Sequence, residues 1–206
     1  MKKMLCLALL LLSVVSTSRS QDAKLWTAAD RKYLLENLTR SRDELLNETR
    51  GLTKEQWIFK ESPDRWSINE IVEHIAIWEL LMTHQISKQL SAGPQPELAK
   101  NAIPDSVNFN FIMEDKKHFS TDYTKPFTYT LPMGINDLDN NLSWLLKMRN
   151  ESINYVAKAT EDLRMHYTTG SRSNTHQVYI TLFGHTDRHI RQIKKVKQHA
   201  AYPNAK

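Results

Sequence analysis

The sequence predicts an all-α fold, a four-helix bundle with a long crossover between its second and third helices. Apolar residues recur at helical spacing in four long segments, the pattern of helices that bury one face. Five prolines lie between Ser91 and Ile135 and prevent a long helix from forming there. With 206 residues, 40% of them apolar, the chain can build one domain with a substantial core. A four-helix bundle is the arrangement that buries four such stripes together.

The first helix is predicted from Thr27, its N-cap, to about Arg50. Gly51 follows directly and provides the residue type that most often ends a helix. The buried stripe of this helix is expected to contain Leu34, Leu38, Leu45 and Leu52. A single helical turn over Thr53–Trp57 comes next, before the chain enters a loop.

The second helix is predicted to begin after Pro63, which interrupts the preceding segment. Ser67 and Glu70 form a capping box, with the serine as N-cap and the glutamate at the third helical position. The helix continues to about Leu90, with an apolar face made of Ile71, Ile75, Trp78 and Met82. His74 lies within this face, where a single histidine is most simply a hydrogen-bonded core residue.

The crossover between Ser91 and Ile135 is expected to hold a short helix around Phe109–His118 and an extended segment at Phe127–Leu131. The third long helix is predicted from about Asn136 to Leu163. Arg149 interrupts its stripe, which otherwise consists of Leu138, Leu142, Leu145, Ile153 and Val156.

The fourth helix follows a polar connection and occupies Thr175–His199, with a stripe made of Val178, Leu182, Ile193 and Val196. His185 and His189 are four residues apart, so their side chains stack about 5–6 Å apart from Cβ to Cβ. Both imidazoles can reach one ion at the roughly 2.0–2.1 Å of a zinc–nitrogen bond. A pair of this kind is also common at the edge of a core, so it predicts only half of a metal site.

Residues 1–20 are predicted to be a signal peptide, which leaves residues 21–206 as the mature domain. The chain starts with basic residues, and the apolar run Leu5–Val15 is too short to span a bilayer. Ser18 and Ser20 place small residues where a signal peptidase cleaves. We therefore expect an exported protein, periplasmic or secreted.

Cleavage would also remove the only cysteine, Cys6, and with it any disulfide or thiolate ligand. It would lower the formal net charge from +5 to +2, because three of the 28 Lys and Arg residues lie in the signal peptide. The basic run from Arg188 to Lys197 lies in the last turns of a helix, where it complements the helix dipole. We expect no nucleic-acid partner and no membrane association after cleavage. A homodimer is compatible with the sequence, and the small-molecule substrate is unknown.

Two segments, Asp64–Ala76 and Leu182–Ile193, resemble the DinB-like superfamily. In that family a Trp-Ser pair opens the second helix and a histidine follows about two turns later. The last helix of the family carries His-x-x-x-His with a glutamine three residues on, and all of these are present here. The resemblance implies an up-down-down-up four-helix bundle and a divalent metal ion, zinc or nickel, held by His74, His185 and His189.

Three imidazoles would leave at least one coordination position for water, which is typical of a catalytic zinc site. Two other metal sites of helical proteins are excluded, because the sequence contains neither Glu-x-x-His nor His-Glu-x-x-His. Glu70 and Asp187 are candidates to orient the ligands, although a cap and a solvated helix residue are the simpler interpretations. His176 is a candidate pocket residue, whereas His84, His118, His166 and His199 are expected elsewhere.

Two functions remain open at this point. The first is an exported metal-dependent hydrolase or group transferase, since the resembling family contains thiol-dependent transferases, isomerases and proteins described as metal-dependent hydrolases. The second is a non-catalytic exported bundle that binds a metal or a small molecule. A carboxylate or base near the open metal position would favour the enzyme. A pocket closed by apolar residues such as Trp78 and Phe183 would favour the binding protein. The sequence identifies no catalytic residue beyond the metal ligands.

Overall fold

The computed structural model describes residues 25–115, 131–134, 136–168 and 172–204. Within these ranges the regular elements are helices, as predicted: α1 (Ala28–Thr49), α2 (Lys54–Ile58), α3 (Ile68–Ser91), α4 (Pro96–Ala99), α5 (Asp105–Met113), α6 (Leu138–Lys158) and α7 (Thr175–Lys197). The predicted signal peptide lies outside the described residues, as does all of the predicted extended segment except Leu131. In the described part of the chain, no helix combines the length and the apolar character needed to cross a bilayer.

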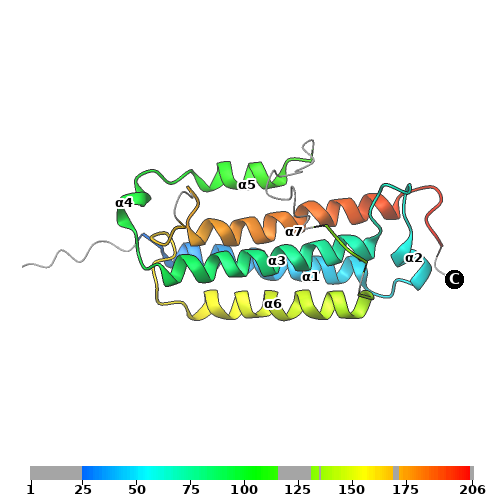
Figure 1. Ribbon diagram of the computed structural model, residues 1–206, viewed down its shortest axis with the longest axis horizontal. Coiled ribbons are helices and arrows are strands. Elements are labelled where there is room, and N and C mark those ends of the chain that lie inside the picture. Colours follow the sequence, from blue (N-terminus) through cyan, green and yellow to red (C-terminus); the bar gives the residue numbers. More distant parts are fainter. Residues whose placement is uncertain (1–24, 116–130, 135, 169–171, 205–206) are drawn as a thin grey trace, which may run out of the picture.

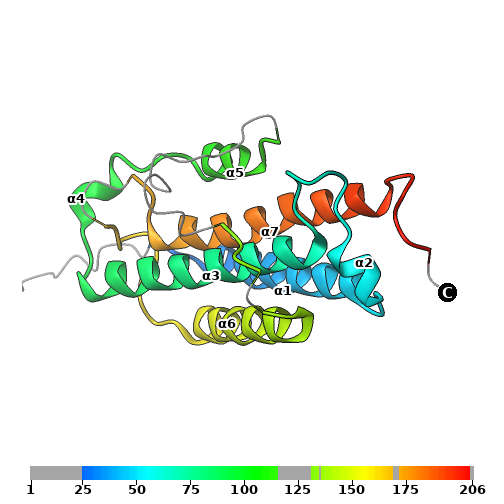
Figure 2. The same cartoon turned by 45° about the vertical axis from the view of Figure 1, so that its right-hand side comes forward.

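Four long helices lie alongside one another (Figure 1). α1 and α7 run in one direction, and α3 and α6 run in the opposite one (Figure 1). α1 packs against α6 and α7, and α3 packs against the same two helices. The turned view in Figure 2 shows that α5 covers the outer side of α7, away from α6.

The helices start where capping residues in the sequence form local hydrogen bonds with the backbone. Thr27 caps α1 and exchanges hydrogen bonds with Asp30, and Ser67 does the same with Glu70 at the start of α3. The capping box of α7 is formed by Asn174, immediately before the predicted start at Thr175. These boxes satisfy N–H groups that have no partner within a helix.

Two helices, α5 and α6, differ clearly from their predicted bounds. α5 begins and ends earlier than the predicted Phe109–His118, because Pro104 fixes its start and Glu114 is already extended. His118 itself lies outside the described residues. α6 ends at Lys158 rather than Leu163, because the carboxylate of Asp162 accepts the backbone N–H groups of Leu25 and Trp26 just before α1.

The core consists of two apolar clusters with a polar layer between them. One cluster contains Leu34 and Leu38 of α1 together with Phe183 of α7, and the other contains Leu45 of α1 with Ile193 of α7. The layer between them holds the buried polar residues Ser41, Glu79, Arg149 and Thr186, one from each long helix. Arg149 therefore interrupts the apolar stripe, as predicted, but does so inside the core.

α5 approaches α7 closely at Gly184. A Cβ atom at this position would lie 2.7 Å from Cγ2 of Ile112, so only glycine permits the observed distance between the two helices. The amide nitrogen of Asn108 also donates hydrogen bonds to the carbonyl of Gln177 and the hydroxyl of Thr181. These contacts place part of the crossover against the helix that carries His185.

Candidate metal centre

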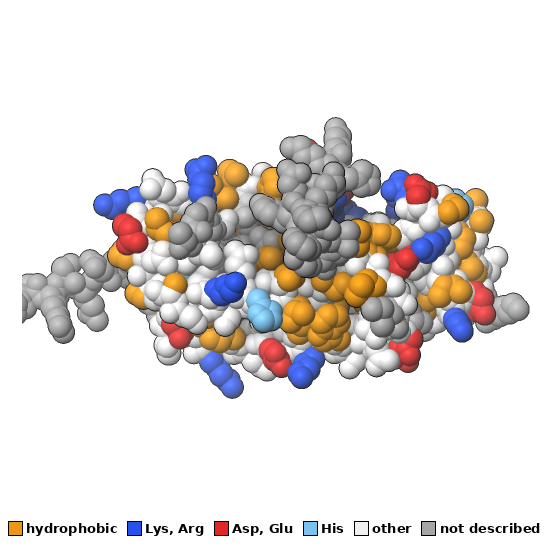
Figure 3. Space-filling model, in the orientation of Figure 1, with side chains coloured by type: hydrophobic (Ala, Val, Ile, Leu, Met, Phe, Trp, Pro, Cys, Tyr) orange, Lys and Arg blue, Asp and Glu red, His pale blue; other side chains and the backbone are white. Residues whose placement is uncertain are grey.

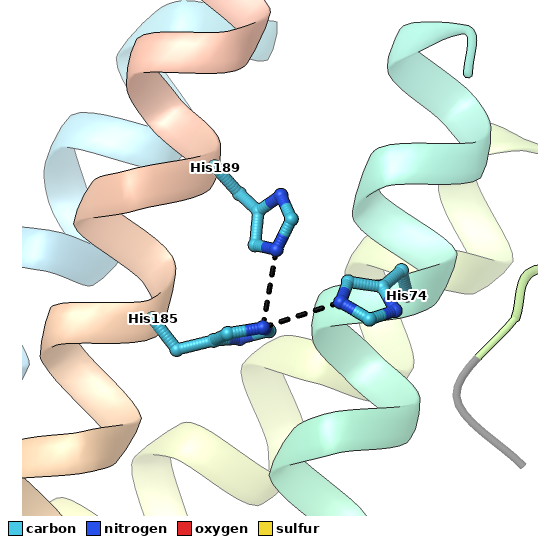
Figure 4. Close-up of side chains that lie close together, drawn as sticks. All are labelled: His74, His185 and His189. Carbon is cyan, nitrogen blue, oxygen red and sulfur yellow. Dashed lines mark hydrogen bonds between the residues drawn. The ribbon is translucent and has the colours of Figure 1, made fainter. Parts of the chain in front are cut away.

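Three buried histidines from two helices meet at one point. His74 extends from α3 toward His185 and His189 on α7 (Figure 4). Nε2 of His185 lies 3.2 Å from Nε2 of His74 and 3.1 Å from Nε2 of His189. The three residues are 7%, 4% and 5% exposed, in chain order from His74. The structure thus brings together the three side chains that the resemblance singled out.

These separations fit a metal ion. Two nitrogens 3.1–3.2 Å apart that share an ion at about 2.05 Å subtend an angle of about 100° at it. That angle lies between the octahedral value of about 90° and the tetrahedral value of about 109°. The donor set of neutral imidazoles suits zinc, nickel and related divalent ions.

A hydrogen bond orients one of these rings. Nδ1 of His189 lies 2.9 Å from Oε1 of Gln192, one helical turn further along α7. With Nδ1 donating its proton to this oxygen, Nε2 keeps the lone pair that a metal ligand needs. The glutamine three residues after the second histidine therefore has a physical role in the site.

The surroundings keep His185 and His189 neutral. Burial lowers the pKa of His185 well below its usual value, and the neighbouring imidazoles and the charge of Arg188 lower it further. Burial, His74 and Arg188 likewise lower the pKa of His189, against the opposing effect of its hydrogen bond to the amide oxygen of Gln192. At neutral pH both rings are therefore free of the extra proton that would compete with a metal.

Two tryptophans border the histidine triangle. The ring of Trp66 lies 4.8 Å from that of His74 and 6.3 Å from that of His189, between centroids. The ring of Trp78 lies 4.6 Å from that of His185, with 24° between the planes. Phe183, which with Trp78 was considered as a residue that could close the pocket, packs against Tyr33 and Phe109.

A comparison with protein-family models matches residues 37–193 to the DinB superfamily. The chain belongs to the DinB superfamily. The match includes the three histidines, both tryptophans that border them, and Gln192. No curated protein and no solved structure matches the chain.

Neither carboxylate proposed to orient the ligands does so in this DinB-superfamily chain. Glu70 accepts hydrogen bonds from the backbone N–H of Ser67 and from Lys60, and Asp187 forms an ion pair with Arg40. The interpretation of Glu70 as part of a helix cap is therefore correct. Asp187 is not the solvated residue that was expected, because its side chain is only 12% exposed and paired with Arg40.

A third carboxylate lies directly before His74, but it too has other partners. Glu73 is buried and accepts the backbone N–H groups of Met133 and Gly134 at 3.1 and 2.9 Å. It holds the chain that leads into α6 against α3. Sequence reasoning missed this contact, because no local pattern pairs residues separated by about 60 positions.

His176 lies apart from the three histidines. It is nine residues before His185, a distance of about 13 Å along α7. Its Nδ1 accepts a hydrogen bond from the indole N–H of Trp26 at 3.2 Å, and its Nε2 lies 3.3 Å from Asp105. Asp105 also binds Arg164, so His176 belongs to a polar network at the start of α7.

Proposed function

We propose that this protein is a metal-dependent enzyme, a hydrolase or group transferase, built on an up-down-down-up four-helix bundle. Its divalent ion, zinc or nickel, would be held by His74, His185 and His189. The convergence of three Nε2 atoms, with 3.1 and 3.2 Å separating His185 from the other two, is the observation that carries the proposal. The antiparallel course of the four long helices supports the bundle topology (Figure 1).

Three protein ligands leave at least one position for a water molecule or a substrate atom, as in catalytic zinc sites. A bound ion would supply Lewis acidity and lower the pKa of the group at that position. The protein supplies the remaining functions: Gln192 fixes the tautomer of His189, and burial keeps the imidazoles of His185 and His189 neutral. The carboxylates of Glu70, Glu73 and Asp187 bind other groups of the protein. The ion would therefore lower the pKa of the reacting group, and none of these three carboxylates would act as its base.

The alternative is a non-catalytic exported bundle that binds a metal or a small molecule. The low exposure of the three histidines, between 4% and 7%, favours this function, as do the flanking indole rings. Turnover in a panel of ester and thiol substrates distinguishes the two functions. Metal binding without turnover would favour the alternative.

We also propose export, on the strength of the basic start, the apolar run Leu5–Val15 and the small residues Ser18 and Ser20. N-terminal sequencing of exported protein should begin at Gln21, and an intact Met1 would contradict this.

A small-molecule substrate is proposed rather than a nucleic acid. Basic and acidic side chains are interspersed over the face drawn in Figure 3. In the last turns of α7, Lys194 pairs with Glu44 and Lys197 pairs with Glu48. Among the described residues on this face, the basic side chains do not gather into the concentrated patch that phosphate binding favours. Association into a homodimer stays a prediction.

Metal analysis of protein purified without a histidine tag tests the site. His74→Ala and His185→Ala should each lose stoichiometric metal, because two imidazoles compete poorly with water for a divalent ion. His84→Ala is the matched control, since His84 is an exposed histidine on the same helix as His74. Wild-type metal content in the His74→Ala protein would reject the three-histidine site.

Thermal unfolding gives a second measurement on the same variants. An ion that binds only the folded state stabilises it by about 2.7 kcal/mol at a concentration 100 times its Kd. Excess chelator should therefore lower the melting temperature of the wild type and of His84→Ala. It should change the melting temperature of His74→Ala much less.

A further inference from the structure

Among the described residues, the indole N–H of Trp78 is a buried donor without a hydrogen-bond partner, and it lies beside the proposed metal site. Nε1 of Trp78 is buried and has no hydrogen-bond acceptor within the part of the chain that the structure describes. By contrast, the indole N–H of Trp26 donates to His176. A buried N–H without an acceptor is costly, so a ligand that provides one is favoured at Trp78.

The position of Trp78 relative to the histidines indicates where such a ligand would lie. Trp78 is one turn beyond His74 on α3 and stacks on His185. Trp66 borders the edge of the triangle between His74 and His189. The third edge of the triangle joins His185 and His189, which lie one turn apart on α7. A molecule at the open metal position would therefore extend between the two indole rings, both of which are partly exposed.

The charge at the site determines whether an anionic or a neutral ligand is favoured. Three neutral imidazoles leave the full charge of a divalent ion uncompensated. The nearest carboxylate in sequence, that of Glu73, is engaged with two backbone N–H groups. The positive charge of Arg188 also acts on His185 and His189. An anionic ligand is therefore favoured over a neutral one.

We propose that Trp78 determines the specificity of this site for small anions that carry a planar apolar group next to the metal-binding oxygen or sulfur. The indole ring, one face of which is stacked on His185, would contact the planar group, and the indole N–H would donate to a second heteroatom of the anion. This inference rests on the proposed metal site and adds the class of substrate to it. Aryl hydroxamates provide this combination of features and serve as probes.

The test uses Co²⁺-loaded full-length mature protein, whose visible absorption reports both metal content and ligand binding. Wild type should bind benzohydroxamate about 10-fold more tightly than acetohydroxamate, as expected for one aromatic contact. Trp78→Leu should reduce this ratio to about 3-fold or less. Trp78→Phe keeps a ring and should retain most of the ratio, while binding both hydroxamates several-fold more weakly because the N–H is lost. Trp144→Phe on α6 is the matched control and should behave as wild type.

A measurement on unmutated protein covers the case in which Trp78→Leu does not fold. In the zinc-loaded protein, the indole N–H resonance of Trp78 is identified by its absence in Trp78→Phe. Benzohydroxamate should shift it downfield and leave the resonance of Trp26 in place.

The possible failures are distinguishable. If wild type takes up no cobalt, both the metal site and the role of Trp78 are rejected. If cobalt binds stoichiometrically but Trp78→Leu keeps the wild-type ratio, only the role of Trp78 is rejected. A bound hydroxamate that leaves the Trp78 resonance unmoved rejects that role as well.

Discussion

Arg149→Met should lower the free energy of unfolding by about 3–5 kcal/mol, the cost of breaking a buried ion pair. The guanidinium of Arg149 donates two hydrogen bonds of 2.8 Å to the carboxylate of Glu79. It also donates to the hydroxyls of Ser41 and Thr186 at 2.8 and 2.9 Å. The two charged side chains are 2% and 1% exposed, so water cannot replace the lost partner.

The structure predicts different costs for the single and double variants. Methionine at position 149 leaves the carboxylate of Glu79 buried without a counter-charge. The hydroxyls are not orphaned, since Ser41 also bonds to Leu38 and Thr186 to Leu182 within their own helices. Glu79→Leu combined with Arg149→Met removes both charges and should therefore cost less than either single variant.

Urea and thermal unfolding, followed by circular dichroism, measure these differences. For a domain of this size, 1 kcal/mol corresponds to about 2–4 °C, so Arg149→Met should melt about 6–20 °C below wild type. Arg40→Met is the control, because its ion pair with Asp187 is partly exposed and should contribute about 1 kcal/mol or less. A loss below about 1 kcal/mol for Arg149→Met, or a double variant whose loss equals the sum of the singles, would refute the reasoning.

Gly184→Ala should destabilise the protein by about 0–2 kcal/mol net, because overpacking against Ile112 costs about 1–3 kcal/mol and the gain in helix propensity is about 1. In an Ile112→Ala background the same change should be neutral or stabilising, as measured by urea unfolding. Burial alone would raise the pKa of Asp30, but hydrogen bonds from Arg164 and from the backbone of Thr27 lower it to about 2. The resulting stability is present above the usual aspartate pKa and is lost as pH falls toward 2. Arg164→Gln should therefore make the free energy of unfolding depend less on pH in that range. Gln192→Ala should weaken metal binding by about 10–100-fold in competition with a chelating dye, since it frees the ring of His189.

The sequence predicted those features of the fold that depend on neighbouring residues. The capping box of Ser67 and Glu70 is complete within four residues, so the start of α3 follows from those residues alone. The spacing of His185 and His189 likewise placed both rings on one face of α7. The addition of His74 required the family resemblance, because nothing local links it to residues on another helix.

The features that could not be predicted from the sequence depend on contacts between residues that lie far apart in the chain. Arg149 was identified only as an interruption, and its partner Glu79 lies 70 positions away on another helix. The early end of α6 has the same origin, since Asp162 binds backbone groups about 136 positions away. The apolar periodicity of a segment contains no information about such partners, and a buried charge is stable only where one is present.

The polar layer and the histidine site are connected through α7. Thr186, which accepts a hydrogen bond from Arg149, is the residue after His185. Since Arg149 also binds Glu79 on α3, this network fixes α7 against α3 at the level where the histidines face each other. The protein's own contacts therefore hold the Nε2 atoms of His74 and His185 3.2 Å apart. A site assembled in advance loses little conformational entropy when it binds, so the buried ion pair would contribute to metal affinity as well as to stability.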